Sequence, residues 1–484
     1  MPTRGRSTRA SLAAAGLAVA TLLAACGGTT LHPASPSTSL SPTAAATTPT
    51  PTPTPVLTPT PTPALTAAWP VYHQNTERTG QSPDTPAVGT LATAWTANLD
   101  GAVWAEPIVV GGDVIVATDN DTLYALNPQS GAVVWQDHVG TPVPESALPC
   151  GDIFPLGMTG TPAYDPATQS IFVVAEETGP IHVLYDFNAV TGAVLWSRQV
   201  DISSPLEHPA AVQQRPALTV ADGYVYIGFG GLDGDCSQYV GAVVAVPTDN
   251  QGATLDFMVP TSREGAVWAT GGPVLTANGD ILVATGNGAA EGGTWDESDS
   301  VLELSPTLQL VSDFAPNRWA YDNAHDLDLG SVAPTLLPDG YIFIAGKSGI
   351  GYVLQESSLG GVGGAIYSAP VCQGAMSFGG TSFSGDTLYQ PCSNGIEAIS
   401  VASNGTFSIL WQTPSGANGP PVLGGGSVFS VDTNNGNLYV LDPTTGAVQA
   451  QISVGSVPHF ASPALLGDLA LVPTRAGVVA ISGV

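Results

Sequence analysis

Short apolar runs alternate with polar turns along most of this chain, and one such pattern recurs without a gap. LYALNPQSGAVVW (residues 123–135), LYDFNAVTGAVLW (184–196) and LYVLDPTTGAVQA (438–450) each hold an apolar run, a turn with Asn or Asp and a small residue before Gly, and a second apolar run. Alternation interrupted by such turn residues is typical of β-hairpins. No helical period of useful length intervenes, so we predict an all-β fold.

Weaker copies of the hairpin fill the spaces between these three. They read VVAVPTDNQGATLDF, VLELSPTLQLVSDF, GYVLQESSLGGVGGAIY, IEAISVASNGTFSILW and the fragment GVVAISGV. Most copies follow two further short apolar runs, so that one unit has four strands and recurs about every 40 to 60 residues, the spacing of propeller blades. We count eight units and predict an eight-bladed β-propeller of four-stranded blades.

The eighth unit supplies only three strands, and the missing one has a candidate at the other end of the repeats. LATAWTANL (91–99) precedes the first blade, and its Trp95 has the place that Trp135, Trp196 and Trp411 have in their own blades. We predict that this N-terminal strand closes the ring and removes the open sheet edges.

The first 26 residues have the form of an export signal. Three arginines precede a short apolar stretch, too short to span a bilayer as a mature helix, and LAAC ends at Cys26. LAAC resembles the bacterial lipobox, whose cysteine becomes the lipidated N-terminus; an ordinary signal peptide that contains a cysteine is the alternative. We expect lipidation at Cys26 and anchoring to the outer face of a bacterial cell membrane.

Residues 27–67 are almost all Thr, Pro, Ser, Ala and Gly. Such a composition buries too little apolar surface to fold, and its prolines keep the chain extended. We predict a disordered linker that holds the propeller, residues 68–484, away from the membrane.

The composition and the spacing of one motif exclude two classes of partner. Only ten Lys and Arg oppose 39 Asp and Glu, for a formal net charge of −29, whereas nucleic-acid binding requires clustered basic residues. The GKS of AGKSGIGYVL (345–354) is not a nucleotide loop, because Gly340 and Gly346 have the wrong spacing and a strand-like run follows. We therefore expect neither nucleic acid nor nucleotide as a partner.

Four cysteines follow Cys26, namely Cys150, Cys236, Cys372 and Cys392. An even number in an exported chain without a CxxC pair favours disulfides over metal thiolates. Sequence alone allows three pairings. The positions of these cysteines in the predicted blades favour Cys150 with Cys236 and Cys372 with Cys392.

The repeat, the opening WPVYHQNTERTG (69–80) and the blade count together resemble one known superfamily. They are similar to the pyrroloquinoline-quinone (PQQ) repeat propellers, the quinoprotein alcohol dehydrogenase-like superfamily, over residues 69–484. The resemblance implies the eight-bladed fold. It leaves activity open, since the superfamily includes both calcium- and PQQ-dependent dehydrogenases and non-catalytic envelope lipoproteins.

The resemblance implies a quinone site at three positions of this chain. Trp268, in REGAVWATGGP, corresponds to the tryptophan that stacks on the quinone, and Asp328, in HDLDLGS, to the general base. Lys347, in GKSG, corresponds to the basic residue that contacts the quinone oxygens and is the only lysine in the chain.

The same resemblance implies a calcium site. Asn287, in ATGNG, is similar to the family's calcium-binding asparagine, and Asp328 would add a carboxylate. The acidic ligand would come from FGGLDGDCSQYVGAV (229–243), where we prefer Asp235 to Asp233. Calcium prefers six or more such oxygen ligands.

Each candidate also has a structural explanation. Trp268 suits the core of a β-protein, Asn287 tolerates a left-handed turn between glycines, and Lys347 suits a solvated hairpin tip. The DLDLG segment suits a strand entry, on which Asp326 and Asp328 would face the same side.

Three functions remain open at this stage. The dehydrogenases' adjacent cysteine pair and a haem motif are absent from the sequence, and the acidic ligand is Asp rather than Glu. We therefore expect first a non-catalytic scaffold that binds an envelope protein or a glycan. The alternatives are a PQQ- and calcium-dependent alcohol dehydrogenase and a calcium-stabilised scaffold without quinone.

Overall fold

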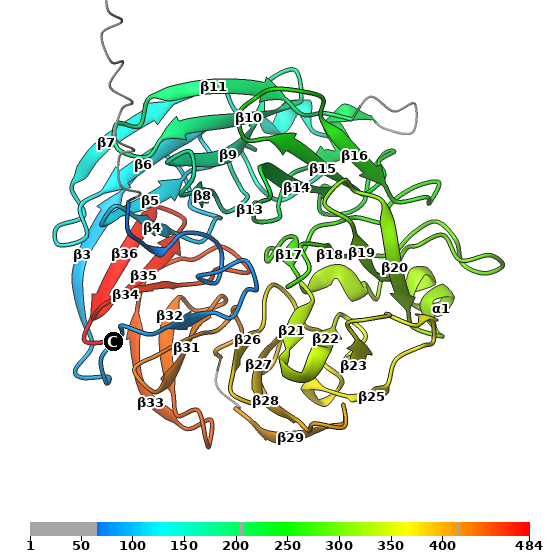
Figure 1. Ribbon diagram of the computed structural model, residues 1–484. Helices are drawn as coiled ribbons and strands as arrows, with labels where there is room; N and C mark the ends of the chain where they lie inside the picture. The colour runs from blue at the N-terminus through cyan, green and yellow to red at the C-terminus, as the bar shows by residue number, and fades with distance from the viewer. Residues whose placement is uncertain (1–64, 203–207, 414–415) are drawn as a thin grey trace, which may run out of the picture. The chain divides into compact units, whose positions relative to one another are not determined.

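A computed structural model describes residues 65–202, 208–413 and 416–484, which form eight small sheets arranged in a ring (Figure 1). This arrangement confirms the all-β, eight-bladed fold. The predicted export signal, Cys26 and nearly all of the predicted linker lie outside the described residues.

The first four blades follow the chain in order and are built from antiparallel strands, except that the short β24 pairs with blade 4 in parallel. Blade 1 has the order β1 (Ala67–Trp69), β4 (Ile108–Val110), β5 (Asp113–Ala117), β6 (Thr122–Leu126), β7 (Val133–His138). Blade 2 comprises β8 (Ala163–Asp165), β9 (Ser170–Glu177), β10 (Ile181–Asn188) and β11 (Val194–Gln199). Blade 3 comprises β12 (Val212–Gln213) and β13 (Thr219–Ala221), both paired with β14 (Tyr224–Gly231), then β15 (Ala242–Pro247) and β16 (Leu255–Met258). Blade 4 comprises β17 (Val274–Leu275), β18 (Ile281–Ala284), β19 (Val301–Leu304), β20 (Leu310–Ala315) and, beside it, β24 (Gly361–Val362).

The other four blades complete the ring. Blade 5 comprises β21 (Thr335–Leu337), β22 (Tyr341–Ala345), β23 (Ile350–Gln355) and β25 (Tyr367–Pro370). Blade 6 comprises β26 (Ser382–Ser384), β27 (Thr387–Cys392), β28 (Gly395–Val401) and β29 (Phe407–Gln412). Blade 7 has the order β2 (Gln81–Ser82), β30 (Val422–Gly424), β31 (Ser427–Asp432), β32 (Asn437–Leu441), β33 (Val448–Ser453). Blade 8 comprises β34 (Ala464–Leu466), β35 (Leu469–Thr474), β36 (Gly477–Ser482) and β3 (Ala92–Asn98).

Helical segments are short and lie in connections between strands. They are α1 (Trp319–Ala324) and the single 3-10 turns η1 (Glu145–Ala147), η2 (Pro209–Ala211), η3 (Leu329–Ser331), η4 (Pro338–Gly340) and η5 (Cys372–Gly374). Within the described ranges no helix has the length and apolar character needed to cross a bilayer.

The N-terminal strand closes the ring, as predicted. Strand β3 pairs with β36 in antiparallel register, with Trp95 opposite Ala480, and becomes the outermost strand of blade 8. The indole Nε1 of Trp95 donates a hydrogen bond to the carbonyl of Pro128 at 2.6 Å, which joins blade 8 to blade 1. Hydrogen bonds between the first and last blades thus hold the ring shut.

The glycine of each strong hairpin repeat lies against a tryptophan of the preceding blade. Gly131 has a φ of +68°, and a Cβ there would come within 2.5 Å of the Trp95 ring. The same contact joins Gly192 to Trp135 and Gly446 to Trp411. The repeat therefore requires glycine at this position both for the left-handed turn and for the approach of the ring.

The segment WPVYHQNTERTG runs across the centre of the ring and contacts several blades. Trp69 Nε1 and the His73 amide both donate to the buried Glu106 of blade 1. The buried Arg78 donates to the Leu218 carbonyl at 3.1 Å and to the Pro273 carbonyl at 3.1 Å, in the connections that lead to β13 and β17. These bonds tie the N-terminal segment to blades on both sides of the axis.

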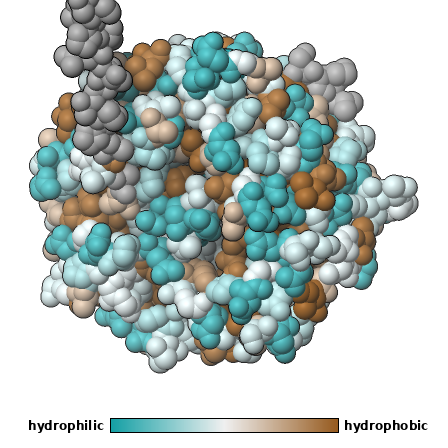
Figure 2. Space-filling model, in the orientation of Figure 1, coloured by the Kyte–Doolittle hydropathy of each residue, from teal (hydrophilic) through white to brown (hydrophobic). Residues whose placement is uncertain are grey.

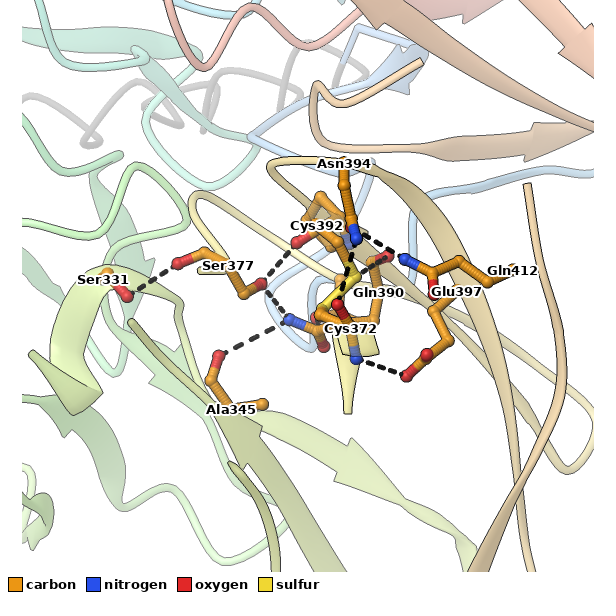
Figure 3. Close-up of a disulfide and its surroundings, with 11 residues drawn as sticks. Ser331, Ala345, Cys372, Ser377, Gln390, Cys392, Asn394, Glu397 and Gln412 are labelled. Carbon is orange, nitrogen blue, oxygen red and sulfur yellow. Dashed lines mark hydrogen bonds between the residues drawn. A yellow bond between two sulfur atoms is a disulfide. The ribbon is translucent and has the colours of Figure 1, made fainter. Parts of the chain in front are cut away.

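Both predicted disulfides are present. Cys150–Cys236 joins the connection between blades 1 and 2 to a loop of blade 3, with 6.1 Å between the Cα atoms. Cys372–Cys392 joins η5 to the end of β27, with 5.5 Å between the Cα atoms (Figure 3). A bond from the Cys372 amide to Glu397, at 2.8 Å, further fixes η5 on blade 6.

The outer strands carry exposed apolar side chains, such as Val134 on β7, Leu195 on β11 and Leu410 on β29, each about half exposed. In the space-filling view, apolar groups are scattered over the rim and also occur in the hollow near the middle of the face (Figure 2). Isolated exposed apolar residues are ordinary on protein surfaces.

Candidate functional site

A cavity of about 670 Å³ lies among the blade connections, and it gathers the residues that the sequence proposed. Trp268, Asn287, Asp328, Lys347 and both acidic alternatives, Asp233 and Asp235, line it. They come from the loops of blades 3, 4 and 5, so the packing of neighbouring blades brings them together.

Asp328 is the most constrained of these residues. Its side chain is buried. Oδ1 accepts a hydrogen bond from the backbone amide of Asn287 at 2.6 Å, and Oδ2 lies 2.9 Å from Lys347 Nζ. Gly286 permits this approach, since a Cβ there would lie 2.9 Å from Oδ1 of Asp328 and 3.1 Å from Nε1 of Trp268. The carboxylate is therefore held from two sides on the wall of the cavity.

Lys347 points at carboxylates and not into bulk solvent. Its side chain is 14% exposed, and Nζ lies 2.6 Å from Asp326, 2.9 Å from Asp328 and 5.5 Å from the centre of the Trp268 ring. Burial opposes the charged ammonium, but the two carboxylates outweigh it and raise the pKa of Lys347 above its ordinary value. The lysine is thus permanently charged at neutral pH. Its turn between β22 and β23 does make a hairpin tip, as the structural explanation held, but not a solvated one.

The two glycines near Lys347, Gly346 and Gly349, are required for different reasons. A Cβ at Gly346 would come within 2.1 Å of the Asp328 carbonyl, to which the Lys347 amide donates at 2.9 Å. Gly349 supplies a φ of +64° at the end of the turn. Glycine is needed at the first position so that the two backbones can meet.

The alternative explanation of DLDLG as a strand entry fails, because no strand begins there. Asp326 follows α1 in a turn with a φ of +53°, and Asp328 immediately precedes η3. Both carboxylates nevertheless reach Lys347, through a turn and not through strand alternation. A single helical turn capped by an acidic residue leaves no periodic signal in the sequence, which explains the error.

Asn287 does not occupy a left-handed turn, because it is not among the residues with positive φ. Its amide donates to Asp328, its carbonyl accepts from Gly265 at 2.7 Å, and its Nδ2 lies 3.5 Å from Glu264. The turn-former explanation for this asparagine therefore fails, and its half-buried side chain borders the cavity.

Asp235 is better enclosed than Asp233, which is exposed. Tyr239 donates its hydroxyl to Asp235, and the neighbouring Cys236 is fixed by its disulfide. Burial raises the pKa of Asp235 above its ordinary value. The hydrogen bond from Tyr239 lowers this pKa, whereas the negative charges of Asp328 and Asp326 raise it further. The carboxylates on this wall therefore repel one another, and a bound cation would relieve that repulsion.

These donors fit calcium in chemical type. Asp235, Asn287 and Asp328 offer carboxylate and amide oxygens on one cavity wall, the ligands that calcium prefers. Within the described part of the chain, however, no three His, Cys, Asp or Glu side chains are grouped closely enough to hold a metal. The asparagine and oxygens of a bound ligand would have to complete the coordination.

Sequence reasoning missed a buried carboxylate behind Asp328. Asp299 has no exposed surface and accepts the Leu329 amide at 2.9 Å, while its Oδ2 has no partner among the described residues. Burial raises its pKa well above the usual range, and the charge of Asp328 adds to the effect. Its sequence context, DESDS, gives no periodic or motif signal.

The far side of the cavity carries a basic group that the sequence did not indicate. Arg215 is buried and donates Nη1 to the Thr159 carbonyl at 3.0 Å, and its Nε has no partner within the described residues. The Arg215 guanidinium lies 6.0 Å from the centre of the Trp104 ring, and His459 meets the same ring at 5.1 Å. Burial and the charges of Arg215 and Arg475 lower the pKa of His459 to about 4, so it is neutral at pH 7. The cavity lining therefore holds a guanidinium as well as carboxylates.

Comparison with known proteins agrees with the propeller fold. The profile of the family described as "Outer membrane protein assembly factor BamB" matches residues 87–301. Over the described chain, the europium-containing methanol dehydrogenase superposes with a TM-score of 0.66 at 17% identity, covering 86% of this chain and 91% of that one. BamB from Moraxella catarrhalis superposes with a TM-score of 0.55 at 14% identity, covering 81% and 97%. At such identities the superpositions show a shared fold alone.

This chain is an eight-bladed propeller that is similar to the PQQ-repeat proteins.

One curated relative of the PQQ-repeat propeller has a named activity. The polyvinylalcohol dehydrogenase of Sphingopyxis sp. (strain 113P3) is 25% identical over 325 residues, which are 57% of this chain. The match spans less than half, 46%, of that relative's length. The propeller is thus related both to alcohol dehydrogenases and to an envelope assembly factor.

Proposed function

We propose that the PQQ-repeat propeller is a quinone- and calcium-dependent alcohol dehydrogenase whose general base is Asp328. One observation carries the proposal: a buried carboxylate is held between the Asn287 amide and the only lysine of the chain, beside Trp268, on the wall of a cavity large enough for a cofactor and a substrate. Pockets of this size with a few convergent polar groups are typical of small-molecule sites.

The chain's own residues divide the work as follows. The Asn287 backbone amide at Oδ1 and the Lys347 ammonium at Oδ2 fix the plane of the Asp328 carboxylate, to which we assign the substrate proton. Trp268 offers a flat apolar face next to the Lys347 ammonium. When bound, the quinone would accept two electrons and two protons as the alcohol becomes a carbonyl compound. Asp235, Asn287 and Asp328 would hold the calcium.

Reconstitution tests this proposal directly. Full-length protein supplied with PQQ and Ca²⁺ should reduce an artificial dye in the presence of alcohols, and PQQ should raise the melting temperature by mass action. Asp328→Asn should abolish dye reduction while keeping the PQQ-dependent shift. If PQQ produces neither a shift nor turnover, the dehydrogenase proposal must be abandoned.

A non-catalytic scaffold is the second candidate, because the BamB family profile matches residues 87–301. Such a protein would bind an envelope protein or a glycan through its rim, with or without calcium, and has no need of the Asp328–Lys347 arrangement. Capture of a defined envelope component by wild type and Lys347→Gln protein alike would favour it.

Export and lipid anchoring at Cys26 belong to the same proposal. The sequence signal and the two disulfides support an oxidising compartment outside the cytoplasm. A Cys26→Ser variant should lose incorporation of labelled fatty acid, whereas a Cys26-containing protein that takes up no label would refute the anchor.

A further inference from the structure

Three aromatic rings from three different blade connections meet at the cavity. Trp268 comes from the connection between blades 3 and 4, Phe378 from that between blades 5 and 6, and Phe460 from that between blades 7 and 8. The centres of the Phe378 and Phe460 rings are 5.3 Å apart, and each lies 6.0 to 6.4 Å from that of Trp268. All three side chains are only partly buried. They form an apolar wall that keeps surface open to the cavity.

Phe460 is held in an unfavourable backbone conformation. Its φ is +60°, in the left-handed region, which costs a bulky residue of the order of 1–3 kcal/mol and persists only where the surroundings impose it. The His459 ring contacts it at 4.4 Å, and His459 Nδ1 lies 3.4 Å from Asp152. Such strain is concentrated at binding sites, where a side chain must be presented in one direction.

Phe378 is fixed by the network around the second disulfide. The adjacent Ser377 accepts a bond from Ser331 at 2.8 Å, and Gln390 donates to the Ser377 hydroxyl (Figure 3). Ser331 lies three residues beyond Asp328 and bonds to its carbonyl at 3.1 Å. The same network therefore positions the apolar wall and the segment that carries the proposed base.

The wall begins directly beside the reactive group. Trp268 lies 5.5 Å from Lys347 Nζ, which lies 2.9 Å from the Asp328 carboxylate. Phe378 and Phe460 line the same cavity as Asp328, so the substituent of an alcohol whose hydroxyl lies at Asp328 has these rings to pack against. Burying that substituent is favourable at about 25 cal/mol per Å² of apolar surface, whereas the hydroxyls of a sugar would lose their bonds to water there.

We propose that Phe378 and Phe460, which lie beside Trp268, select alcohols with an apolar substituent, such as 1-hexanol or benzyl alcohol, over ethanol, glycerol and sugars. This inference rests on the proposed dehydrogenase activity and names its substrate class. In the proposed reaction RCH2OH would lose two electrons and two protons to give RCHO, and a bound quinone would supply the two-electron, two-proton acceptor.

Steady-state kinetics of the full chain, supplied with PQQ and Ca²⁺, test the selection. In Phe378→Ala and Phe460→Gly the ratio of kcat/KM for 1-hexanol to that for ethanol should fall about tenfold, mainly through a higher KM for 1-hexanol. Glycine adopts a positive φ without strain, so Phe460→Gly removes the ring and keeps the turn. Leu410→Ala, which truncates an exposed residue on β29, is the control and should keep the wild-type ratio. An unchanged ratio in both cavity variants overturns the proposal.

A binding measurement separates this proposal from the dehydrogenase itself. Saturation-transfer NMR with benzyl alcohol and the full chain, without added cofactor, should show transfer that Phe460→Gly abolishes and Leu410→Ala retains. If no alcohol is oxidised but this pattern holds, the dehydrogenase proposal falls and the apolar site stands. If wild-type protein shows no transfer from benzyl alcohol, the apolar site is refuted.

Discussion

Lys347 and Asp328 are joined twice, once through their side chains and once through their backbones. Nζ lies 2.9 Å from Oδ2, and the Lys347 amide donates to the Asp328 carbonyl at 2.9 Å. The two residues belong to different loops of blade 5, so this double contact fixes both loops relative to Trp268. The single lysine of the chain therefore holds the Asp328 carboxylate in place.

Lys347→Gln should lower stability and abolish quinone-dependent turnover. Removing the ammonium leaves a buried carboxylate without its cation, which costs about 3 kcal/mol or more in comparable pairs. Urea denaturation measures the loss. Asp326→Asn is the matched control, because that carboxylate contacts the same Nζ but is 64% exposed, and it should change stability little. Equal effects of the two variants would show that Lys347 acts only through surface charge.

Calcium should raise the melting temperature of the wild-type protein, and a chelator should reverse the shift. Asp235→Asn should lose the response to calcium, since it removes one carboxylate from the proposed ligand set. Asp233→Asn, on the same loop but exposed, should retain it. Loss of the response in Asp233→Asn alone would assign the ligand to Asp233. Indifference of the wild-type protein to the chelator would remove the calcium site.

A buried histidine in blade 2 should make stability fall at alkaline pH. His182 lies 2.7 Å from Asp201 and 3.2 Å from Glu176. Burial opposes its charged form, but the two carboxylates outweigh this and raise its pKa to about 10. Because this folded-state pKa exceeds the ordinary 6.5, the stabilisation is complete below pH 6.5 and is lost as the pH rises toward 10.

The two partners of His182 behave differently. Burial opposes ionisation of Asp201, but its bond to His182 prevails and lowers its pKa, whereas burial raises the pKa of Glu176 despite the imidazolium. The pairing with His182 thus outweighs burial at Asp201 but not at Glu176. Urea denaturation between pH 6 and pH 10 should show the decline in wild-type protein and a shallower one in Asp201→Asn. Identical slopes in the two proteins would contradict the ion pair.

The disulfide Cys372–Cys392 should stabilise the fold and the apolar wall together. It closes a loop of 20 residues, for which chain entropy gives about 3 kcal/mol. The double variant Cys372→Ala/Cys392→Ala should lose stability by this order in urea denaturation and should also lose preference for 1-hexanol, because Phe378 lies in the loop. A variant that loses stability but keeps the preference would show that other contacts hold Phe378.

Hairpin repeats predicted the fold because each blade is stabilised by local pairing and by a repeated contact with the next blade. The contact between Gly131 and Trp95 recurs in every strong repeat as a fixed position of glycine in the pattern. The blades and the closing strand could therefore be predicted from the sequence. Side chains in the site leave no such mark. The alternative explanation of DLDLG as a strand entry failed, and Asp299 and Arg215 were missed, because burial and partners depend on distant loops.

The sequence by itself determined a ring of eight blades and its closure by the N-terminal strand, since alternation and turn residues are local or repeated properties; for the disulfides it left three pairings, of which the blade positions favoured the observed one. The resemblance to quinoproteins named Trp268, Asn287, Asp328 and Lys347 but could not say whether they meet. Only the tertiary structure decided that they line one cavity, that Lys347 bridges two carboxylates and that Phe378 and Phe460 face them. The physical reason is that ring closure brings together loops from separate blades, whose distances no local pattern encodes.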